Sequence, residues 1–430
     1  MEQLTYLVTN PLGIHARPAA LLAQTCVDIK GAVTVSCNDR VADGANVLQI
    51  LALAAKQGDT LTVTVEGENE AEDIKEIESL LQKEFAGKNV DVLKIAFFGT
   101  KDYDRTFFSE LTKVKGEGTY NSDIKYFTVR LTPETVGLTK GFDAVCIFVN
   151  DEAPRQVVEA LHDNGVKLIL LRCAGFNNVD LQAAKECGIT VLRVPAYSPY
   201  AVAEHAMAIL QESNRRLHKA HNKVKENNFA LSGLLGLDLH NKVAGIMGTG
   251  RIGICMAEIC KGYGMKVLGW DAFPNKALEE SGLLTYVEKE ELLAKSDLIS
   301  LHAPLFPSTY HLIDAKAISL MKDNVMLVNT SRGPLVDAEA LIEALKNGKF
   351  HAVALDVYEG EDANVYTDRS DEPLTNDITG RLLMFPQVVL TSHQAFFTRE
   401  ALQAIATVTM ENARNFNEGK EYGMAEVSAK

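Results

Sequence analysis

The sequence has no run of apolar residues approaching the roughly 20 that a membrane-spanning helix needs. Its first ten residues, MEQLTYLVTN, alternate between polar and apolar types and do not resemble a signal peptide. Hydrophobic residues make up 47% and charged residues 23% of the chain, and no segment has the biased composition of a disordered region. These absences predict a folded cytoplasmic protein, and 430 residues suggest about three domains of roughly 150 residues each.

Positive charge is scarce as well. The chain carries 43 Lys and Arg against 57 Asp and Glu, a formal net charge of −14, and its basic residues are scattered. Nucleic acids select proteins with a positive face, so we predict no nucleic-acid partner. The lack of a long apolar run likewise predicts no membrane partner. The seven cysteines include no CxxC pair, and Cys255 and Cys260 are five residues apart on a predicted helix, hence on different faces. We therefore predict buried thiols and no metal site.

The first 88 residues have the pattern of one small α+β sandwich domain. Alternating apolar and polar residues predict strands over QLTYLVT, VTVSC, RVA and LTVTVEG. Helical patterns begin at about Pro18 and then cover VLQILALAAK and EAEDIKEIESLLQKEF. The stretch from Ala86 to Asn89 interrupts the periodicity and is predicted to be a linker.

Beyond Val92 the pattern changes to buried strands that alternate with amphipathic segments. The strands are LKIAFFGT, FDAVCIFV, VKLILLRC, ITVLRVP, KVAGIMG, KVLGWD, DLISLH, VMLVNT, HAVALD and VVLTSH. This alternation predicts parallel sheets with helices on both faces. The number of strands favours two successive α/β domains over one large sheet, with a long helix over PYAVAEHAMAILQESNRRLHKA between the two series.

A GxGxxG motif follows the predicted strand VAGIM and begins a predicted helix. In this position the glycines permit a tight turn, a close approach of pyrophosphate to the backbone, and close helix–strand packing. The next strand ends in Asp271, whose carboxylate can accept both ribose hydroxyls and repels a 2′-phosphate, which favours NAD over NADP. The alternative is a glycine-rich turn in another Rossmann-type protein. The predicted contacts are Gly248, Thr249, Gly250, Arg251, Ile252, Gly253 and Asp271.

Three later strands end in residues suited to the reduction of a 2-oxo acid. Arginine binds carboxylates and polarises carbonyls through its planar charged fork, and histidine delivers a proton. NTSRG contains Arg332, LDVYEGE contains Asp356 and Glu361, and TSHQAFFTRE contains His393. Open α/β sheets place their sites at these strand ends. Each residue also has a structural alternative: Arg332 can bind a carbonyl at the sheet end, Glu361 can be a solvated acid, and His393 can be a packed histidine.

Together, RCAGFNNVD, VPAYSPYAVAEHA, GTGRIG, SLHAPL, NTSRGPLVD, LDVYEGE and SHQAFFTREAL resemble segments of the D-isomer-specific 2-hydroxyacid dehydrogenases, above all the D-lactate dehydrogenases. The resemblance covers about residues 94–420. It implies two Rossmann- or flavodoxin-like domains: a substrate domain split into residues 92–197 and 395–430, and an NAD-binding domain, 198–394, inserted between them. It also implies that the helix at 198–219 is a dimerisation arm and that the protein is a homodimer.

The same resemblance implies roles for single residues. Arg332 would bind and polarise the substrate and His393 would be the general acid. Glu361, which follows Arg332 by 29 residues, would pair with His393 in preference to Glu359. Further cofactor contacts would come from His302, Pro304, Thr330 and Asp356, the last near the nicotinamide carboxamide.

The substrate would be held by other segments. Ala174 and Gly175 would bind its carboxylate through their backbone, with Asn177 nearby. Tyr197 and Phe396 would be apolar walls, with ordinary packing as the alternative. Four histidines match no role: His205, His218, His221 and His351.

Residues 1–85 resemble HPr, the histidine-containing phosphocarrier of the sugar phosphotransferase system, an open-faced α+β sandwich, through GIHARPA and VADGANVLQILALAAKQGD. The resemblance implies that His15 accepts a phosphoryl group at a helix N-terminus, where free N–H groups and the helix dipole favour an anion, and that Arg17 supports it. The alternative is that His15 only caps the helix or that the domain is a relic. Asn46 stands where many relatives have a regulatory serine; it can cap a helix but cannot be phosphorylated.

These features predict NADH-dependent reduction of pyruvate to D-lactate by an enzyme with an appended phosphoryl-accepting domain. Another small 2-oxo acid, such as hydroxypyruvate, is the alternative substrate. The alternative function is a phosphotransferase-system carrier or a redox-sensing regulator whose dehydrogenase body mainly binds NADH. Proteins of the phosphotransferase system are the predicted macromolecular partners.

Overall fold

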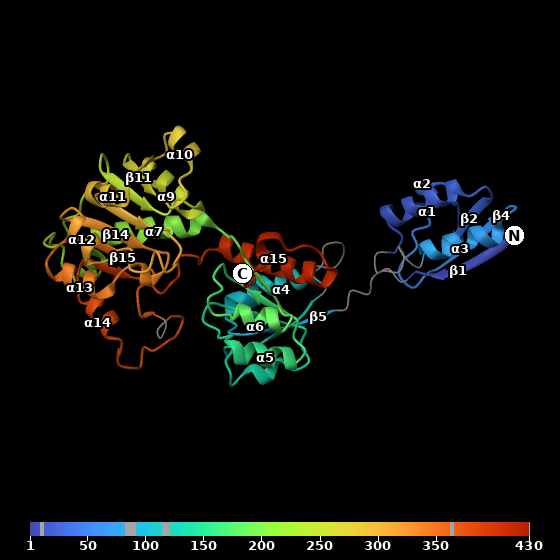
Figure 1. Cartoon of the computed structure of the whole chain (residues 1–430), viewed down its shortest axis with the longest axis horizontal. Helices are drawn as coiled ribbons and strands as arrows, with labels where there is room; N and C mark the ends of the chain where they lie inside the picture. Colours follow the sequence, from blue (N-terminus) through green and yellow to red (C-terminus); the bar gives the residue numbers. More distant parts are fainter. Residues whose placement is uncertain (9–12, 82–91, 114–119, 121, 362–364, 430) are drawn as a thin grey trace. The chain divides into compact units, whose positions relative to one another are not determined.

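The structure is a computed structural model that describes residues 1–8, 13–81, 92–113, 120, 122–361 and 365–429. The chain divides into two compact units, one of residues 1–194 and 406–430 and one of residues 195–405 (Figure 1). The predicted linker from Ala86 to Asn89 lies outside the described residues. Within the described part, no helix is long and apolar enough to cross a membrane.

The N-terminal segment forms a four-stranded antiparallel sheet in the order β1-β4-β2-β3. Its strands are β1 (Glu2–Leu7), β2 (Ala32–Cys37), β3 (Arg40–Asp43) and β4 (Thr60–Glu66). The helices α1 (Ala16–Asp28), α2 (Val47–Ala52) and α3 (Glu70–Leu80) pack on one face (Figure 1). Leu61, Val63 and Val65 of β4 point into this core and are fully buried, whereas Thr62 and Thr64 between them face outward. This period-two pattern is what the sequence predicted.

Two helix boundaries of this domain differ from the prediction. Helix α1 begins at Ala16, not at about Pro18. Proline has no N–H to donate, but N–H groups in the first turn of a helix have no helical acceptor, so Pro18 fits within this turn. Helix α2 ends at Ala52, and only part of the predicted helix forms. There the Arg40 guanidinium donates to the carbonyl oxygens of Ala52 and Leu53 at 3.0 and 3.5 Å, and Ala54 turns the chain with a φ of 49°.

A five-stranded parallel sheet has the order β6-β5-β7-β8-β9, as in flavodoxin-like folds. Its strands are β5 (Leu93–Phe97), β6 (Ser122–Tyr126), β7 (Ala144–Ile147), β8 (Leu168–Leu171) and β9 (Thr190–Arg193), and its helices are α4 (Asp102–Lys113), α5 (Arg155–Asp163) and α6 (Leu181–Glu186). The edge strand β6 was not predicted, because SDIKY is short and only half-buried. The C-terminal segment returns to this sheet: Ala406, Met410 and Ala413 enter its core, and Val427 N–H donates to the carbonyl oxygen of Val191.

The second unit is built on a seven-stranded parallel sheet in the order β12-β11-β10-β13-β14-β15-β16. The strands are β10 (Val243–Met247), β11 (Lys266–Trp270), β12 (Thr285–Tyr286), β13 (Leu298–Leu301), β14 (Val325–Asn329), β15 (Phe350–Leu355) and β16 (Val388–Leu390). Helices flank it: α9 (Arg251–Gly262), α10 (Lys276–Glu280), α11 (Lys289–Lys295), α12 (Ala315–Leu320), α13 (Ala338–Lys346) and α14 (Asp377–Leu383). The order reverses between β10 and β13, which is where open α/β sheets bind ligands.

The predicted single helix over 199–220 is two helices, so that prediction was wrong. Helix α7 (Pro199–Arg215) begins where the Ser198 hydroxyl accepts the N–H of Ala201 at 3.2 Å. Arg216 then adopts a left-handed φ of 54°, and α8 (Leu217–Lys225) continues from it. The Arg216 guanidinium donates to the carbonyl oxygen of His351 at 2.7 Å, a long-range contact that periodicity does not reveal.

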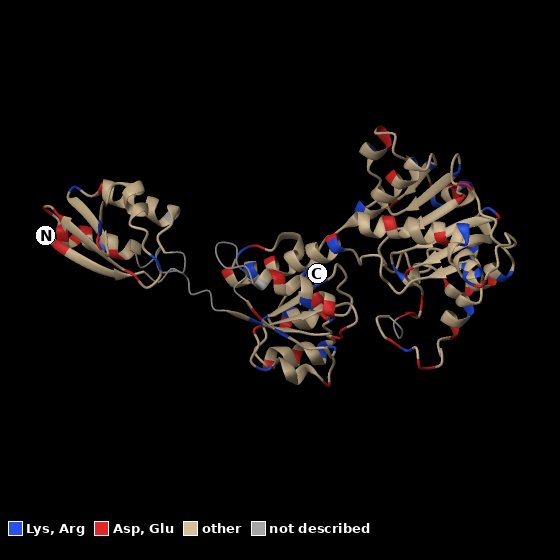
Figure 2. Cartoon of the chain, turned by 180° about the vertical axis from the view of Figure 1, so that it is seen from behind, with Lys and Arg blue, Asp and Glu red and all other residues tan. Residues whose placement is uncertain are grey.

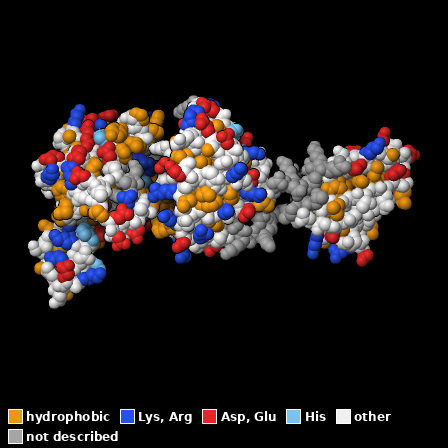
Figure 3. Space-filling model, turned by 90° about the horizontal axis from the view of Figure 1, so that it is seen from below, with side chains coloured by type: hydrophobic (Ala, Val, Ile, Leu, Met, Phe, Trp, Pro, Cys, Tyr) orange, Lys and Arg blue, Asp and Glu red, His pale blue; other side chains and the backbone are white. Residues whose placement is uncertain are grey.

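The last helix, α15 (Arg399–Glu418), leads from the second unit back to the first. Lys and Arg are interspersed with Asp and Glu along the elements (Figure 2). Hydrophobic side chains occur on the surface in small groups between charged ones (Figure 3).

Candidate active site

The GxGxxG segment forms the turn between β10 and α9. Gly248 has a φ of 95°, and a Cβ atom there would lie 2.6 Å from the backbone of His302 and Ala303. A Cβ on Gly253 would lie 2.0 Å from the Gly248 carbonyl oxygen. Gly250 precedes α9 as its N-cap, and no described atom lies within 4 Å of the place of its Cβ. The first and third glycines therefore close the turn, and the second leaves open space in front of a helix N-terminus.

Asp271 lies directly after β11, beside this turn. Its Oδ2 accepts the Thr249 N–H at 2.6 Å and the Thr249 hydroxyl at 3.1 Å, and its Oδ1 accepts the Phe273 N–H at 2.9 Å. Tyr286 of β12 places its hydroxyl 2.8 Å from the Thr249 hydroxyl. The carboxylate is thus oriented by the glycine turn itself, and Tyr286 is a neighbour that the motif does not include.

The segment after β13 contributes His302 and Pro304. The Ser300 hydroxyl lies 2.7 Å from His302 Nε2, and burial lowers the pKa of His302 from 6.5 to about 4. His302 is therefore a neutral ring at neutral pH. Pro304 is exposed, and its carbonyl oxygen accepts the Thr309 hydroxyl at 2.7 Å.

Thr330 follows β14 at the same edge of the sheet. Its hydroxyl is buried and has no hydrogen-bond partner among the described residues. A buried polar group without a partner is costly, and this hydroxyl is open to a hydrogen bond with a ligand atom. With the open space at Gly250 and the carboxylate of Asp271, these residues fit a dinucleotide.

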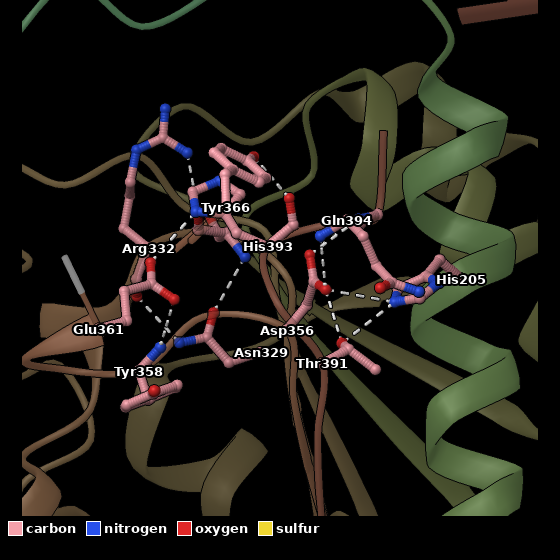
Figure 4. A network of polar contacts seen from close by, with 12 residues as sticks. His205, Asn329, Arg332, Asp356, Tyr358, Glu361, Tyr366, Thr391, His393 and Gln394 are labelled. Atoms are coloured by element: carbon pink, nitrogen blue, oxygen red, sulfur yellow. Dashed lines mark hydrogen bonds and ion pairs between the residues drawn. The ribbon is translucent and has the colours of Figure 1, made fainter. Parts of the chain in front are cut away.

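Glu361 and His393 form the central contact of a polar network at the ends of β15 and β16 (Figure 4). Glu361 Oε1 lies 3.1 Å from His393 Nδ1, and Glu361 Oε2 accepts the Tyr358 N–H at 3.3 Å. The Glu361 side chain is 10% exposed and that of His393 is 26% exposed. The carboxylate is therefore shielded, while the imidazole remains accessible.

The backbone of His393 is held in an unusual conformation. Its φ is 53°, its N–H donates to the Asp356 carbonyl oxygen at 2.9 Å, and its own carbonyl oxygen accepts the Tyr366 hydroxyl at 2.7 Å. Tyr366 itself has a φ of 58°. Left-handed non-glycine residues are uncommon and persist where their surroundings determine them, often at functional sites.

Asp356 anchors the loop that carries His393. Its Oδ1 accepts the Thr391 hydroxyl at 2.6 Å and the Gln394 N–H at 2.9 Å, and its Oδ2 accepts the Ala395 N–H at 2.9 Å. His205 Nε2, from α7, lies 3.3 Å from the same Oδ1. Burial opposes ionisation of this carboxyl, but the hydrogen bonds outweigh burial, so the pKa of Asp356 lies below its usual range.

Arg332 projects from the turn after β14. The Asn329 side chain shapes this turn: its amide donates to the Arg332 carbonyl oxygen at 2.9 Å, and its oxygen accepts the Ser331 N–H at 3.0 Å. The Arg332 guanidinium donates to the Ser331 carbonyl oxygen at 2.7 Å. The residue as a whole is half-buried. Figure 4 shows Arg332, Glu361 and His393 on the same side of the sheet edge, although they come from three different loops.

Aromatic rings border this network. The ring centroids of Tyr197 and Phe396 lie 6.5 Å apart, and those of Tyr366 and Phe396 lie 6.4 Å apart. In the other unit, the Ala174 carbonyl oxygen accepts the Arg193 guanidinium at 3.0 Å, and the Gly175 carbonyl oxygen accepts the Cys173 thiol at 3.2 Å. The carbonyls of both residues are engaged, and their substrate role stays a prediction.

His15 is the N-cap of α1, with an extended backbone and no side-chain cap bond to a described residue. Gly13, with a φ of 65°, packs so closely that a Cβ would lie 2.1 Å from the Ala55 carbonyl oxygen, and Ile14 N–H donates to that oxygen at 3.0 Å. These contacts hold the turn, and the imidazole is half-buried beside the first turn of α1. The Arg17 side chain lies outside the described residues.

Asn46 caps α2 as predicted, accepting the N–H groups of Leu48 and Gln49.

Comparison with known proteins places this site in a family. A family model described as the NAD-binding domain of D-isomer-specific 2-hydroxyacid dehydrogenases matches residues 207–395. The D-lactate dehydrogenase of Escherichia coli is 45% identical over 328 residues, which cover 76% of this chain and 98% of the relative. This chain belongs to the D-isomer-specific 2-hydroxyacid dehydrogenases. A 2-hydroxyacid dehydrogenase homolog of Haemophilus influenzae is 49% identical over 328 residues, 76% of this chain and 97% of that protein.

Solved structures agree with the fold of this dehydrogenase. The apo structure of the Escherichia coli D-lactate dehydrogenase has a TM-score of 0.70 at 44% identity and covers 78% of this chain and 100% of that one. The pyruvate reductase of Chlamydomonas reinhardtii has a TM-score of 0.73 at 41% identity, with coverages of 78% and 99%. A family model for the HPr component of the phosphotransferase system, described by its phosphorylation site, matches residues 3–83. The predicted family, fold class and NAD cofactor are therefore confirmed.

Several residues of this dehydrogenase's site were not predicted. Thr391 lies two residues before His393 in the sequence, so its place in the site could have been predicted from that spacing. His205 and Tyr366 contact Asp356 and His393 across 151 and 27 residues of chain. No spacing rule connects such distant positions, and only the folded chain reveals them. His351, also without a predicted role, contacts the Asn214 side-chain oxygen at 3.0 Å.

Proposed function

We propose that this dehydrogenase reduces pyruvate to D-lactate with NADH. The contact that carries the proposal is Glu361 Oε1 to His393 Nδ1 at 3.1 Å, which presents a histidine supported by a shielded carboxylate. Arg332 lies beside the pair. Names of relatives at 41–45% identity, D-lactate dehydrogenase and pyruvate reductase, support the choice of substrate.

In this proposal the chain's own residues bind the substrate and move its proton. Reduced NAD, when bound, supplies a hydride to C2 of the 2-oxo acid. With Nδ1 engaged by Glu361, His393 gives the proton on Nε2 to the C2 oxygen, and the Glu361 carboxylate stabilises the charged ring beforehand. The guanidinium of Arg332 holds the substrate carboxylate and polarises the carbonyl at C2.

The cofactor is held by the turn after β10 in the same proposal. The open space at Gly250 admits the pyrophosphate to the α9 N-terminus, and Arg251, Ile252 and Thr249 line the turn. Asp271, held by the turn, would accept the ribose hydroxyls of the bound cofactor. The roles of His302, Pro304, Thr330 and Asp356 as cofactor contacts rest on their placement at the strand ends of this sheet.

An assay of the purified chain with NADH and a panel of 2-oxo acids tests the proposal. We expect rapid NADH oxidation with pyruvate and a D-configured product on chiral analysis. Faster oxidation with hydroxypyruvate would reassign the substrate while retaining the reaction. NADH binding without turnover of any 2-oxo acid would refute the enzyme function and favour a redox-sensing regulator.

We further propose that His15 accepts a phosphoryl group from a protein of the phosphotransferase system. The imidazole stands before a helix of 13 residues whose first turn has no acidic side chain and receives no cap bond from the His15 side chain, and helix N-termini favour anions. Phosphorylation by the general phosphotransferase enzyme and phosphoenolpyruvate, compared in the wild type and His15→Ala, tests this. Label on the His15→Ala variant would reject His15 as the acceptor.

A homodimer that includes the segment after α8 is a third part of the proposal. Phe229, Leu231 and Leu235 are 70%, 83% and 86% exposed in the single chain, which is unusual for large apolar residues so close together. Light scattering of the wild type and of Leu231→Ser/Leu235→Ser tests it: a dimeric wild type and a monomeric variant are expected.

The seven free thiols suit a reducing compartment, so we place the protein in the cytoplasm.

A further inference from the structure

A second histidine–carboxylate pair lies two residues from Glu361. Glu359 places Oε1 3.0 Å and Oε2 3.2 Å from His311 Nε2. The Tyr310 hydroxyl donates to Glu359 Oε1 at 3.2 Å, and the Tyr310 and His311 rings stack with centroids 4.0 Å apart. The side chains of His311 and Glu359 are each 27% exposed. The pair is therefore a half-buried contact with several supporting groups, unlike a solvated pair of surface charges.

His311 also binds the segment that follows Arg332. Its N–H donates to the Pro334 carbonyl oxygen at 2.9 Å, and its Nδ1 lies 3.7 Å from Asp337 Oδ2. A further backbone bond joins the same two segments: the Asp337 N–H donates to the Ile313 carbonyl oxygen at 3.0 Å. One residue thus joins two segments, its backbone to the turn of Arg332 and its side chain to the turn of Glu361.

The two segments also touch each other directly. A Cβ on Gly333, the residue after Arg332, would lie 2.4 Å from the carbonyl carbon and oxygen of Tyr358. Ala338 N–H points to Glu359 Oε2 at 3.4 Å. The two turns are therefore in contact at Gly333 and joined at Glu359, and His311 is bonded to both of them.

We infer that His311, acting through Glu359, is a positioning residue that sets Glu361 relative to Arg332. Its described contacts are with the two segments and with Tyr310, so its effect on the reaction passes through the geometry of those two side chains. A misplacement of about 1 Å in a catalytic group costs up to about 100-fold in rate. The kinetic consequence rests on the proposed function, whereas the tie between the segments does not.

The choice of variants follows from the backbone of His311. Its φ of 51° is a conformation that His and Asn tolerate better than most residues. His311→Asn therefore preserves the turn while its shorter side chain loses Glu359. Glu359→Ala removes the other partner, and Glu359→Gln restores a hydrogen-bond acceptor at the same distance. His162→Asn, an exposed histidine at the end of α5, is the matched control.

The test combines steady-state kinetics with hydrogen–deuterium exchange of the full-length protein. In His311→Asn and Glu359→Ala we expect kcat with pyruvate to fall about 10- to 100-fold, with NADH affinity unchanged. The double variant should be no slower than either single variant, because both break one contact. Amides of residues 332–337 and 356–361 should exchange faster, while Glu359→Gln and His162→Asn should resemble the wild type.

Each other outcome overturns a stated part of the inference. Unchanged exchange in the two segments refutes the tie, whatever the kinetics show. Faster exchange with wild-type kcat refutes the effect on the reaction, and faster exchange throughout the unit assigns His311 to general stability. If the wild type turns over no 2-oxo acid, the proposed function fails, and the exchange of the two segments still decides whether His311 joins them.

Discussion

Oε1 of Glu361 lies 3.1 Å from Nδ1 of His393 and joins the loops that follow two neighbouring strands, β15 and β16. Glu361 is 10% exposed, so little water competes for its carboxylate. His393 is held by Asp356 and Tyr366 at a positive φ. The orientation of the imidazole is therefore determined by the fold before any substrate binds, which is the preorganisation that proton transfer requires.

Replacement of Arg332 by lysine is expected to lower kcat/KM for pyruvate by about 10²- to 10³-fold, because a single ammonium cannot hold a carboxylate and polarise a carbonyl as the planar fork does. NADH affinity, measured by fluorescence titration, should remain that of the wild type. Arg381→Lys is the matched control, since Arg381 forms an exposed pair with Glu339 at 2.8 Å. Wild-type turnover in Arg332→Lys would remove Arg332 from the proposed mechanism.

Replacement of Glu361 by glutamine is expected to lower kcat for pyruvate reduction by about 10²-fold or more, within the range of general acid–base effects. The amide retains the size of the side chain but not its negative charge, so it no longer holds His393 Nδ1 through a charge-assisted hydrogen bond. Steady-state kinetics with pyruvate measure this loss, and NADH affinity should remain that of the wild type. Glu343→Gln, at an exposed pair with Lys346, should leave kcat unchanged. A wild-type kcat in Glu361→Gln would reject the role of the pair.

Alanine substitutions should separate two roles within the glycine turn. At Gly250 the added Cβ meets no described atom within 4 Å, so Gly250→Ala should unfold like the wild type but bind NADH more weakly, because the methyl group occupies cofactor space. At Gly253 the Cβ would lie 2.0 Å from the Gly248 carbonyl oxygen, so Gly253→Ala should lower the stability of the unit. Gly262→Ala, also in open space, is the control for both measurements. Unimpaired NADH binding by Gly250→Ala would contradict the proposed pyrophosphate site.

Protonation of His302 is expected to oppose folding of the seven-stranded unit. Burial lowers the pKa of His302 from 6.5 to about 4, so between these values the unfolded chain binds more protons than the folded chain. The free energy of unfolding is therefore highest above pH 6.5 and falls as the pH decreases through this window. Urea unfolding followed by the fluorescence of Trp270, the single tryptophan, measures it.

The same unfolding experiment on His302→Gln identifies the group responsible. Glutamine can still contact the Ser300 hydroxyl but does not titrate, so the variant should lose part of the pH dependence. An equal pH dependence in both proteins would show that another group causes it.

Local patterns in the sequence determined which segments form strands and helices, and which polar residues stand at the ends of the strands. The fully buried runs of β13 and β14 predicted parallel strands, because helices cover both faces of such a sheet. The glycine spacing predicted the cofactor turn for a similarly local reason. The positions of Arg332, Glu361 and His393 after three successive strands predicted that they would meet at one sheet edge, since parallel strands end together.

Other features depended on contacts between distant segments. The break at Arg216 is accompanied by a bond to His351, and Asp356 meets His205 of α7. Glu359 and Glu361 are both glutamates of one turn, yet one faces His311 and the other His393. Hydrophobic periodicity records which face of an element is buried, but it does not record which distant element covers that face. For this reason the sequence alone determined most of the elements and the chemistry at the strand ends, and only the tertiary structure decided which side chains became partners.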